Sequence, residues 1–517
     1  MGPSNPAPQP KGFDDSWKAG TRRVTVSSFE PDDFEAFPRF LRSQDPSTVP
    51  QARRPRRSRF LVALLRLAPA AFVSATVALT AVWIYSENRA SNRSQAADSR
   101  PSTTPMVRST DQRASDAAGA ATESPATAVA ATAPLPATRA NASGTVRGVT
   151  DREIRFGMAA PFSGSAKELG HEMKIGTEAA FGPVNEAGGI YGRQLTLVTA
   201  DDGYEPARTA DAVRELRDKQ NVFGMIGNVG TPTAMVSLPY ALEHRMLFFG
   251  AFTGANLLRR DPPDRYVFNY RASYAEETDA VVRYLVNVRR VPPEQIAVFA
   301  QQDAYGDAGF AGVAKAIRAM RLDAAALLRL NYRRNTVDVD DAVAQLRAHR
   351  APIKAIVMVA TYRAAAKFIE KTRDLYPAMI YTNVSFVGST ALAEELMLLG
   401  PRYASGVIVT QVVPAVDSYA TAILDYKSAL GKFFPGETPD YVSLEGFVAA
   451  RVLAEALRRA GPQLDTEKLV DSLEGLRDLD LGLGTPVNYG RTEHQAVHKV
   501  WGTELDGNGH YQAIDLQ

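Results

Sequence analysis

Two loops in the sequence combine residue types that can bind an anion. In the first, Gly230, Thr231 and Pro232 follow the apolar segment 222–228. Glycine lets a backbone approach a ligand closely, threonine is a favourable helix N-cap, and proline suits the first helical position. The free N–H groups at the start of the helix then attract negative charge. Phe252–Thr253–Gly254 repeats this arrangement one strand later. The alternative is that both threonines only cap their helices.

Two tyrosines occupy similar positions in the second half of the chain. Tyr305, within Ala304–Tyr305–Gly306, follows one expected strand, and Tyr362 follows the apolar segment AIVMVAT. An aromatic ring with a polar tip can both desolvate a small ligand and form a hydrogen bond with it. The alternative is that both rings pack beneath loops.

Other patterns indicate chemistry more weakly. His494 and His498 are four residues apart and could share a metal on a helix, but their segment is expected to be a strand. Asp201 and Asp202 resemble an acidic metal pair, although we expect them to fix the turn after a strand, with Asp202 accepting backbone N–H groups. The sequence has no phosphate loop, nucleophile elbow or paired catalytic carboxylates in a suitable context. We therefore expect no enzyme activity, no cofactor and no bound metal.

Composition narrows the possible functions. The 517 residues suggest about three folding units. Lys and Arg total 59 against 57 Asp and Glu, a net charge of +2 that does not favour nucleic-acid binding. The absence of cysteine excludes disulfides, thiol catalysis, Cys-ligated metals and an acylated-Cys anchor, and only 6 histidines are present.

The elements that must position these residues begin near residue 151. Apolar strands at 153–159, 194–202 and 222–228 alternate with helical patterns, and the alternation resumes at 295 and continues through strands near 325–330 and 355–361. Such alternation predicts parallel sheets covered on both faces, with ligands bound beyond the carboxyl ends of the strands. Because roughly 365 residues are too many for one such sheet, we expect two doubly wound α/β lobes.

The first 150 residues differ from the rest in composition. Residues 1–59 are Pro-rich, charged and expected to be largely disordered and cytoplasmic. Residues 60–85 predict a transmembrane helix, whose charge-free part, 67–85, matches the roughly 20 residues that cross a bilayer. Residues 86–150, rich in Ala, Ser, Thr and Pro, predict a flexible tether.

Arginines set the expected orientation of this membrane span. Five of them precede it, against Arg89 and Arg93 after it, which places the N-terminus in the cytoplasm and residues 151–517 in the periplasm. We therefore expect a single-pass protein of the bacterial inner membrane. The alternative is a cleaved signal peptide, if the start codon lies further along the chain.

Residues 151–517 contain six separated segments that share one pattern of order: PFSG, EAAFGPVNEAGGIYGRQLTLVTADD, IGNVGTPTA, FFGAFTGANLL, AVFAQQDAYGDAG and GVIVTQVVP. In this order the segments resemble the leucine/isoleucine/valine-binding family of type I periplasmic binding proteins, which serve ABC transporters. The resemblance implies two parallel-sheet lobes joined by a three-strand hinge. It does not extend to residues 1–150, and the membrane span is a departure from most of the family.

The resemblance also implies binding residues and lobe boundaries. Family members grip the ligand's carboxylate at the positions of Gly230, Thr231, Ala251 and Thr253, and close tyrosines over it at the positions of Tyr305 and Tyr362. Leu169 and Tyr274 match further contact positions. We expect one lobe at 151–272 and 410–484 and the other at 273–409 and 485–517. The crossings are then near 270–274, 406–414 and 482–488.

One expected residue is missing. Where amino-acid-binding members place a carboxylate for the ligand's ammonium group, this chain has Thr390, and Tyr274 replaces a second acid. A buried ammonium without a counter-charge is costly. Either Glu168, Glu205 or Glu276 replaces the acid, or the ligand is a small carboxylate, an amide or a urea-like compound.

The sequence thus predicts an extracytoplasmic receptor that closes on a small polar ligand, an amino acid, amide or small carboxylate, with an ABC permease as its candidate partner. The alternative, a membrane-tethered sensor or adaptor with the same fold, is motivated by the membrane span and the charged segment before it.

Overall fold

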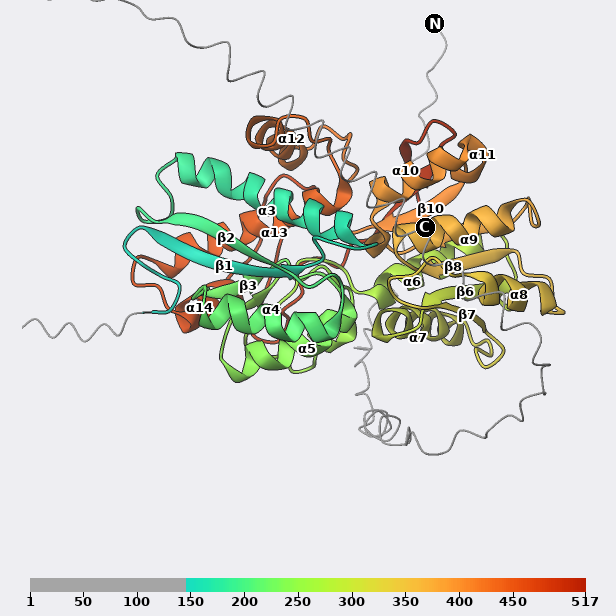
Figure 1. Ribbon diagram of the computed structural model, residues 1–517, viewed down its shortest axis with the longest axis horizontal. Coiled ribbons are helices and arrows are strands. Elements are labelled where there is room, and N and C mark those ends of the chain that lie inside the picture. The colour runs from blue at the N-terminus through green and yellow to red at the C-terminus, as the bar shows by residue number, and fades with distance from the viewer. Residues whose placement is uncertain (1–145) are drawn as a thin grey trace, which may run out of the picture. The chain divides into compact units, whose positions relative to one another are not determined.

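The computed structural model describes residues 146–517 (Figure 1). The predicted membrane span at 60–85 and the predicted disordered segment 1–59 lie outside the described residues, as does most of the tether. Within residues 146–517, no helix is both long and apolar enough to cross a membrane. The folded part begins before residue 151, because Val149 forms a β-bridge with Ile154.

The first lobe contains a five-stranded parallel sheet with the strand order β2-β1-β3-β4-β5. Its strands are β1 (Glu153–Ala160), β2 (Gln194–Asp201), β3 (Gly224–Ile226), β4 (Phe248–Phe249) and β5 (Val267–Phe268). Its helices are α3 (Lys167–Glu186), α4 (Pro206–Asp218), α5 (Thr231–Glu243), α12 (Thr421–Phe433), α13 (Tyr441–Ala460) and α14 (Thr466–Glu474). Figure 1 shows α3 and α13 on one face of the sheet and α4 and α5 on the other.

Glycine allows a close contact between helices α3 and α13 in this lobe. A Cβ atom on Gly176 of α3 would lie 1.9 Å from the carbonyl oxygen of Ser443 in α13. Only a residue without a side chain lets the two helices approach this far. The contact matters for the site because α13 also carries buried acids toward the boundary between the lobes.

The second lobe contains a seven-stranded sheet with the order β12-β11-β10-β9-β8-β6-β7. Its strands are β6 (Ile296–Gln301), β7 (Leu328–Tyr332), β8 (Ala355–Val359), β9 (Ile380–Asn383), β10 (Val407–Gln411), β11 (Trp501–Leu505) and β12 (Tyr511–Ile514). β6 to β10 are parallel, whereas β11 pairs antiparallel with β10 and β12. The predicted parallel sheet is confirmed for β6 to β10, and the C-terminal edge adds an antiparallel hairpin, in which a short turn joins β11 and β12.

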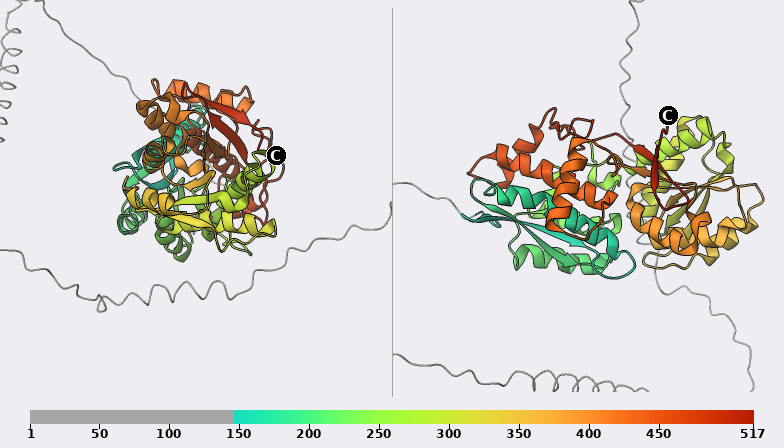
Figure 2. Two further views of the ribbon diagram at one scale, coloured as in Figure 1. Left: turned by 90° about the vertical axis from the view of Figure 1, so that its right-hand side faces the viewer. Right: turned by 90° about the horizontal axis from the view of Figure 1, so that it is seen from above.

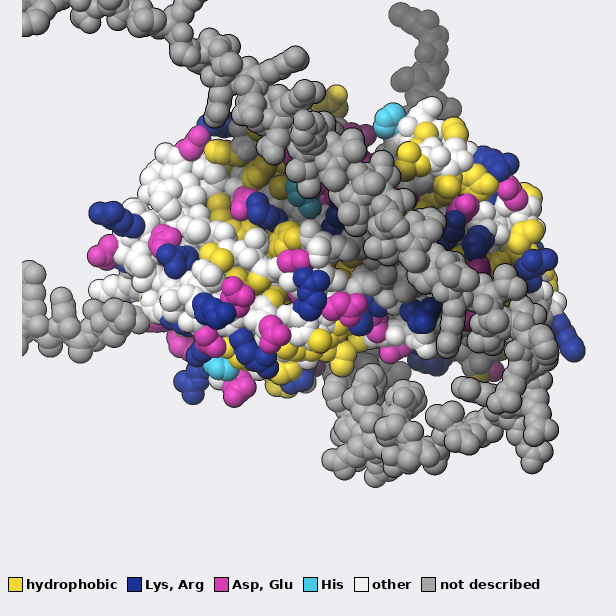
Figure 3. Space-filling model, viewed as in Figure 1, with side chains coloured by type: hydrophobic (Ala, Val, Ile, Leu, Met, Phe, Trp, Pro, Cys, Tyr) yellow, Lys and Arg dark blue, Asp and Glu magenta, His cyan; other side chains and the backbone are white. Residues whose placement is uncertain are grey.

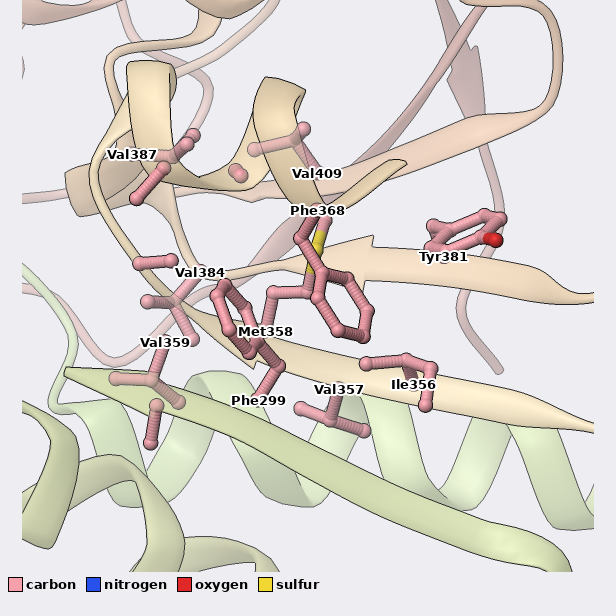
Figure 4. Packing of buried hydrophobic residues seen from close by; sticks show 14 of the residues in the cluster. Phe299, Ile356, Val357, Met358, Val359, Phe368, Tyr381, Val384, Val387 and Val409 are labelled. Carbon is pink, nitrogen blue, oxygen red and sulfur yellow. The ribbon is translucent and has the colours of Figure 1, made fainter. Parts of the chain in front are cut away.

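The helices of the second lobe and the short helical turns complete the fold. The helices are α6 (Tyr274–Arg283), α7 (Ala304–Ala319), α8 (Asp340–Ala348), α9 (Tyr362–Arg373), α10 (Ser389–Leu399) and α11 (Pro401–Ala404). The short turns are η1 (Asn256–Leu258), η2 (Tyr284–Val288), η3 (Pro293–Gln295) and η4 (Ser385–Val387). Figure 4 shows the core of this lobe, where Phe299 and Phe368 stack with ring centroids 4.1 Å apart.

Three chain segments connect the lobes, and the third crosses later than expected. Leu483, Val487 and Tyr489 are buried in the core of the first lobe, so the chain has not yet left that lobe at 482–488. The N–H of Asn269 donates to the carbonyl of His494 at 2.7 Å, which pairs the first connection with the third. The third crossing therefore lies between His494 and β11. Figure 2 shows this C-terminal segment running from one lobe to the other.

One apolar core continues across the boundary between the lobes. Met158, Leu169 and Phe252 of the first lobe belong to the same buried cluster as Tyr305 and Phe386 of the second. Outside this boundary, Figure 3 shows acidic and basic side chains interspersed over the visible face of the described residues, as the balanced composition predicts.

Candidate ligand-binding site between the lobes

The two anion-type loops meet in the first lobe. The Oγ1 atoms of Thr231 and Thr253 are 2.7 Å apart, and both side chains are buried. The N–H of Gly230 donates to the carbonyl of Phe252 at 3.1 Å, and the carbonyl of Ala251 accepts from the N–H of Thr253 at 2.8 Å. The loops therefore bring two hydroxyl groups and the N-terminus of α5 to one place.

Glycine is required where the first of these loops turns into α5. Gly230 has a φ of 106°, a conformation that side chains disfavour. A Cβ atom there would lie 2.3 Å from the ring of Tyr204. The residue thus permits both the turn and the close approach of an aromatic ring.

Five aromatic side chains, which we call the aromatic cluster, meet across the boundary between the lobes. Tyr204 and Phe252 come from the first lobe, and Tyr274, Tyr305 and Phe386 from the second. Phe386 lies at the centre, with ring centroids 4.6 Å from Tyr305, 5.0 Å from Phe252, 6.0 Å from Tyr204 and 6.4 Å from Tyr274. The rings form an apolar, water-excluding surface.

Three tyrosine hydroxyl groups at this boundary form no well-aligned hydrogen bond within the described residues: that of Tyr305 has no polar neighbour, and those of Tyr274 and Tyr362 lie near Thr253 and the backbone of Glu168. Each tyrosine stands in the first turn of a helix that follows a connection or a strand. Burial raises the pKa of Tyr274 and of Tyr362 to about 12 and that of Tyr305 well above its usual value. The hydroxyls are therefore neutral, and burying one without a partner costs about 1–3 kcal/mol.

Leu169 and Tyr362 flank Gly388. A Cβ atom on Gly388 would lie 2.6 Å from Cδ2 of Leu169 and 3.7 Å from Tyr362. Thr390, the position of the expected acid, instead lies near the carboxylate of Asp440 in the first lobe and opposes the rise in the pKa of Asp440 that burial causes. From the same loop it is Phe386 that enters the aromatic cluster. The sequence analysis did not identify Phe386, because an apolar residue that follows a strand has the same pattern as an ordinary core residue.

Each of the three acids proposed as substitutes has contacts of its own within the described residues. Glu168 forms an ion pair with Lys167 at 3.4 Å. Glu276 accepts hydrogen bonds from Ser273 and Gln495 and lies 2.7 Å from His498. Glu205 is occupied by contacts with the second lobe, described below.

A different pair of acids lies beside Thr390. Asp440 caps α13 by accepting from the N–H groups of Val442 and Ser443 at 2.5 Å and 3.1 Å, and burial raises its pKa. Burial, and next the charge of Asp440, raise the pKa of Glu172 to about 9. At neutral pH the pair therefore holds a proton.

Arg271 is the buried charge that the sequence analysis did not identify. Its side chain is 1% exposed. Nη2 donates to Oε1 of Glu277 at 3.0 Å and to the hydroxyl of Ser385, and Nη1 lies 3.6 Å from Oε2 of Glu445. The guanidinium lies over the ring of Phe252, with its carbon 5.0 Å from the centroid. Nothing in its sequence context distinguishes Arg271 from a surface arginine.

Polar side chains also join the lobes at the rim of the site. Arg334 of the second lobe donates to Glu205 of the first at 2.8 Å and to Asp303 of its own lobe at 3.0 Å. Asn335 donates to the carbonyl of Gly203 at 3.0 Å and to Glu205 at 2.6 Å. The lobes are therefore in contact both through the aromatic cluster and through this polar rim.

The weaker sequence motifs have ordinary contacts. His494 stacks on Phe268 with ring centroids 3.9 Å apart, whereas His498 faces Glu276, so the two histidines have different partners. Asp202 accepts from the N–H of Tyr204 at 2.8 Å and fixes the turn, as predicted. Asp201 accepts from Ser163 and neighbouring N–H groups, and these hydrogen bonds hold its pKa at about 2 against the effect of burial.

Two lobes of this topology with a site between them define a class of binding proteins, and the chain belongs to the periplasmic binding protein family, whose model matches residues 153–510. A crystal structure of a possible leucine/isoleucine/valine-binding protein from Rhodopirellula baltica is 38% identical, with a TM-score of 0.67, over 72% of this chain and 98% of that one. Within the family, the chain is a substrate-binding protein of the leucine/isoleucine/valine-binding type.

Two further relatives agree with this assignment. A substrate-binding periplasmic protein from Ralstonia solanacearum is 29% identical, with a TM-score of 0.64, over 70% of this chain and 100% of that one. Leu/Ile/Val-binding protein homolog 3 from Brucella melitensis is 24% identical over 66% of this chain and 88% of its own length.

Proposed function

We propose that residues 146–517 bind a small polar ligand between the two lobes and deliver it to an ABC-type transporter. The observation that carries this proposal is the buried hydroxyl group of Tyr305, which has no partner, together with those of Tyr274 and Tyr362, which form no well-aligned hydrogen bond. Buried polar groups in native proteins normally have a hydrogen-bond partner, and a ligand supplies one. The names of the relatives, Leu/Ile/Val-binding proteins, support a ligand the size of an amino acid.

The site residues have distinct proposed roles. Thr231 and Thr253, with Gly230 and Ala251, bind the ligand's polar end, because hydroxyl donors and the first N–H groups of a helix stabilise negative charge. Tyr274, Tyr305 and Tyr362 supply hydrogen bonds from the second lobe. Leu169 and Phe386 provide apolar contact, and Thr390 acts only through Asp440.

We further propose that the chain is anchored in the inner membrane through residues 60–85, with its N-terminus in the cytoplasm and the ligand-binding part outside it. The support is the length of the apolar segment and the distribution of arginines around it. Alkaline extraction of membranes tests the anchor, because a single-pass protein stays in the pellet.

The binding function is tested by a thermal-shift screen of amino acids, amides and small carboxylates against the full chain, followed by small-angle X-ray scattering with each ligand that binds. We expect stabilisation by one or more of these solutes and a more compact scattering profile when it is bound, as lobe closure predicts. Failure of every solute to raise the melting temperature would overturn the proposal.

The second candidate, a membrane-tethered sensor or adaptor, is favoured by one feature, the charged segment 1–59 before the predicted span. A receptor that only delivers solute has no need of a cytoplasmic segment. Neighbouring genes distinguish the two functions, since permease and ATPase genes accompany transport, whereas signalling genes accompany sensing.

A further inference from the structure

We propose that Arg271 binds the anionic group of the ligand, and that the site selects small carboxylates with an apolar body and no ammonium group. This inference rests on the proposed binding function and names its ligand class. Two observations support it: Arg271 has N–H groups without hydrogen-bond partners, and the neighbouring carboxylates already interact with Arg271.

The guanidinium of Arg271 is only partly used by the protein. Of its five N–H groups, those that form hydrogen bonds within the described residues belong to Nη2. Nε and Nη1 are buried and have no hydrogen-bond partner there, and Oε2 of Glu445 is too far from Nη1, at 3.6 Å, to be one. A guanidinium presents its N–H groups in a planar fork that matches a carboxylate.

Arg271 is placed where a ligand in the site would reach it. Its guanidinium carbon is 5.0 Å from the ring centroid of Phe252 and 5.7 Å from that of Tyr274, two members of the aromatic cluster. Its partner Ser385 directly precedes Phe386, the central ring. The unpaired N–H groups of Arg271 and the hydroxyl of Tyr274 therefore border the same apolar surface.

A second arginine adds positive charge at this place. Arg259 donates to the backbone carbonyl of Arg271 at 3.0 Å and to that of Thr253 at 3.4 Å. It thereby links Arg271 to the threonine pair. An anion bound to Arg271 therefore has a second guanidinium group nearby.

Of the two carboxylates beside Arg271, that of Glu277 is already fully hydrogen-bonded: it accepts from Arg271, from the N–H of Ser385 at 2.8 Å and from the hydroxyl of Thr410 at 2.5 Å. Glu445 forms an ion pair with Nη1 of Arg271 at 3.6 Å, so its charge is committed to the arginine without a hydrogen bond. A ligand ammonium needs free acceptors, whereas the groups free at the aromatic cluster can donate. The geometry consequently favours a ligand that brings only acceptors.

The competing explanation is that Arg271 only fastens the lobes, since Glu277 belongs to the second lobe and Glu445 to the first. That role explains the hydrogen bonds of Nη2 and the pairing of the guanidinium charge with two carboxylates. It leaves buried N–H groups on Nε and Nη1 without partners, which native proteins avoid. The two explanations differ in their consequences for ligand selectivity.

Three solutes with one carbon skeleton separate the explanations: 4-methyl-2-oxopentanoate, L-leucine and 3-methylbutylamine, titrated calorimetrically into the full chain. The matching phenyl set is phenylpyruvate, L-phenylalanine and 2-phenylethylamine. We expect at least one oxo acid to bind ten times or more tightly than its amino acid, and neither amine to bind. Equal or tighter binding of the amino acid would overturn the inference while supporting the proposed receptor function. So would binding of an amine. Absence of binding by all six would also overturn it, whereas the receptor function is judged by the wider solute screen.

Variants test whether Arg271 itself determines this preference. In R271Q we expect the ratio of oxo-acid to amino-acid affinity to fall at least tenfold, and in R271K to fall less, because the charge remains. R334Q is the control: it removes an arginine at the lobe boundary that is already paired, so all ligands weaken alike and the ratio stays. A folded R271Q protein with the wild-type ratio would overturn the role of Arg271. If R271Q does not fold, the affinity ratio in R271K and the ligand preference of the wild type still test the role of Arg271.

Discussion

Arg334 and Glu205 form a direct ion pair between the two lobes, with Nη2 and Oε2 2.8 Å apart. The arginine side chain is 24% exposed and the glutamate 41%, so solvent screens the pair only partly. The pair exists only while the lobes touch. It therefore contributes to the closed arrangement without contacting the aromatic cluster.

Replacing Arg334 with alanine should weaken ligand binding by destabilising the closed arrangement. A partly exposed ion pair contributes up to about 1 kcal/mol, which corresponds to about a fivefold loss of affinity. Calorimetry with a ligand from the screen measures the loss. R451A is the matched control, because Arg451 pairs with Asp425 at 2.7 Å inside the first lobe. An equal loss of affinity in both variants would show that the inter-lobe position is irrelevant.

Removing either hydroxyl of the threonine pair should affect binding more than folding. In T231A or T253A a charge-assisted hydrogen bond to the ligand is lost, which lowers affinity about ten- to a hundredfold. The free energy of unfolding should fall by only about 1–2 kcal/mol, from the lost contact between the two Oγ1 atoms.

Thr233 provides the control for this experiment. It lies in the same helix turn, and its buried hydroxyl donates to the carbonyl of Val229 at 2.5 Å. T233A should therefore lose stability to a similar degree and keep its affinity. The serine variant T231S, which retains the hydroxyl, should bind nearly as well as the wild type. Unchanged affinity in T231A and T253A would remove the proposed role of the pair.

Removing the unpaired hydroxyl of Tyr305 should weaken ligand binding without destabilising the protein. Because it has no partner within the described residues, Y305F should keep or slightly raise the free energy of unfolding of the ligand-free protein, while ligand affinity falls. Urea denaturation and calorimetry measure the two quantities. Y426F is the control: the hydroxyl of Tyr426 lies 2.7 Å from the Oγ of Ser443, so its loss should cost about 1 kcal/mol of stability and leave affinity unchanged. A destabilised Y305F protein with normal affinity would contradict the assignment.

The proton held by Glu172 and Asp440 should make stability fall as pH rises. Because the pKa of Glu172 is raised from 4.5 to about 9, the folded protein binds a proton that the unfolded chain releases between these values. The contribution of Glu172 is therefore greatest below about pH 4.5 and declines up to about pH 9. The difference in urea midpoint between E172Q and the wild type should grow in favour of the variant across this range. E178Q, on the same helix but ion-paired with Lys174, should show no such trend. A pH-independent difference for E172Q would refute the shared proton.

Sequence patterns located the elements that begin or end at the site. Thr231, Tyr305 and Tyr362 were identifiable because each follows a strand and begins a helix, a position that the chain order alone specifies. The structure brings Thr231 to Thr253 and places Tyr305 in the aromatic cluster.

Some residues at the site could be identified only from tertiary contacts. Phe386 and Arg271 have neighbours that are distant in the chain, such as Phe252 and Glu445, so no local pattern marks them. The neighbour of Thr390, Asp440, could not be identified from the sequence for the same reason, because it comes from the other lobe. The position of the third crossing could not be predicted either. Leu483 and Val487 are apolar and could pack in either lobe, and only the structure shows that they are buried in the first.

The aromatic contact between Phe386 and the rings of Tyr204 and Phe252 has a consequence for temperature. Opening the lobes transfers these rings into water, which increases the heat capacity of the protein. The hydrophobic contribution that holds the rings together weakens on cooling. The open form should therefore become more populated in the cold, and the enthalpy of ligand binding should change steeply with temperature. A receptor with a solely polar contact between its lobes would lack this dependence.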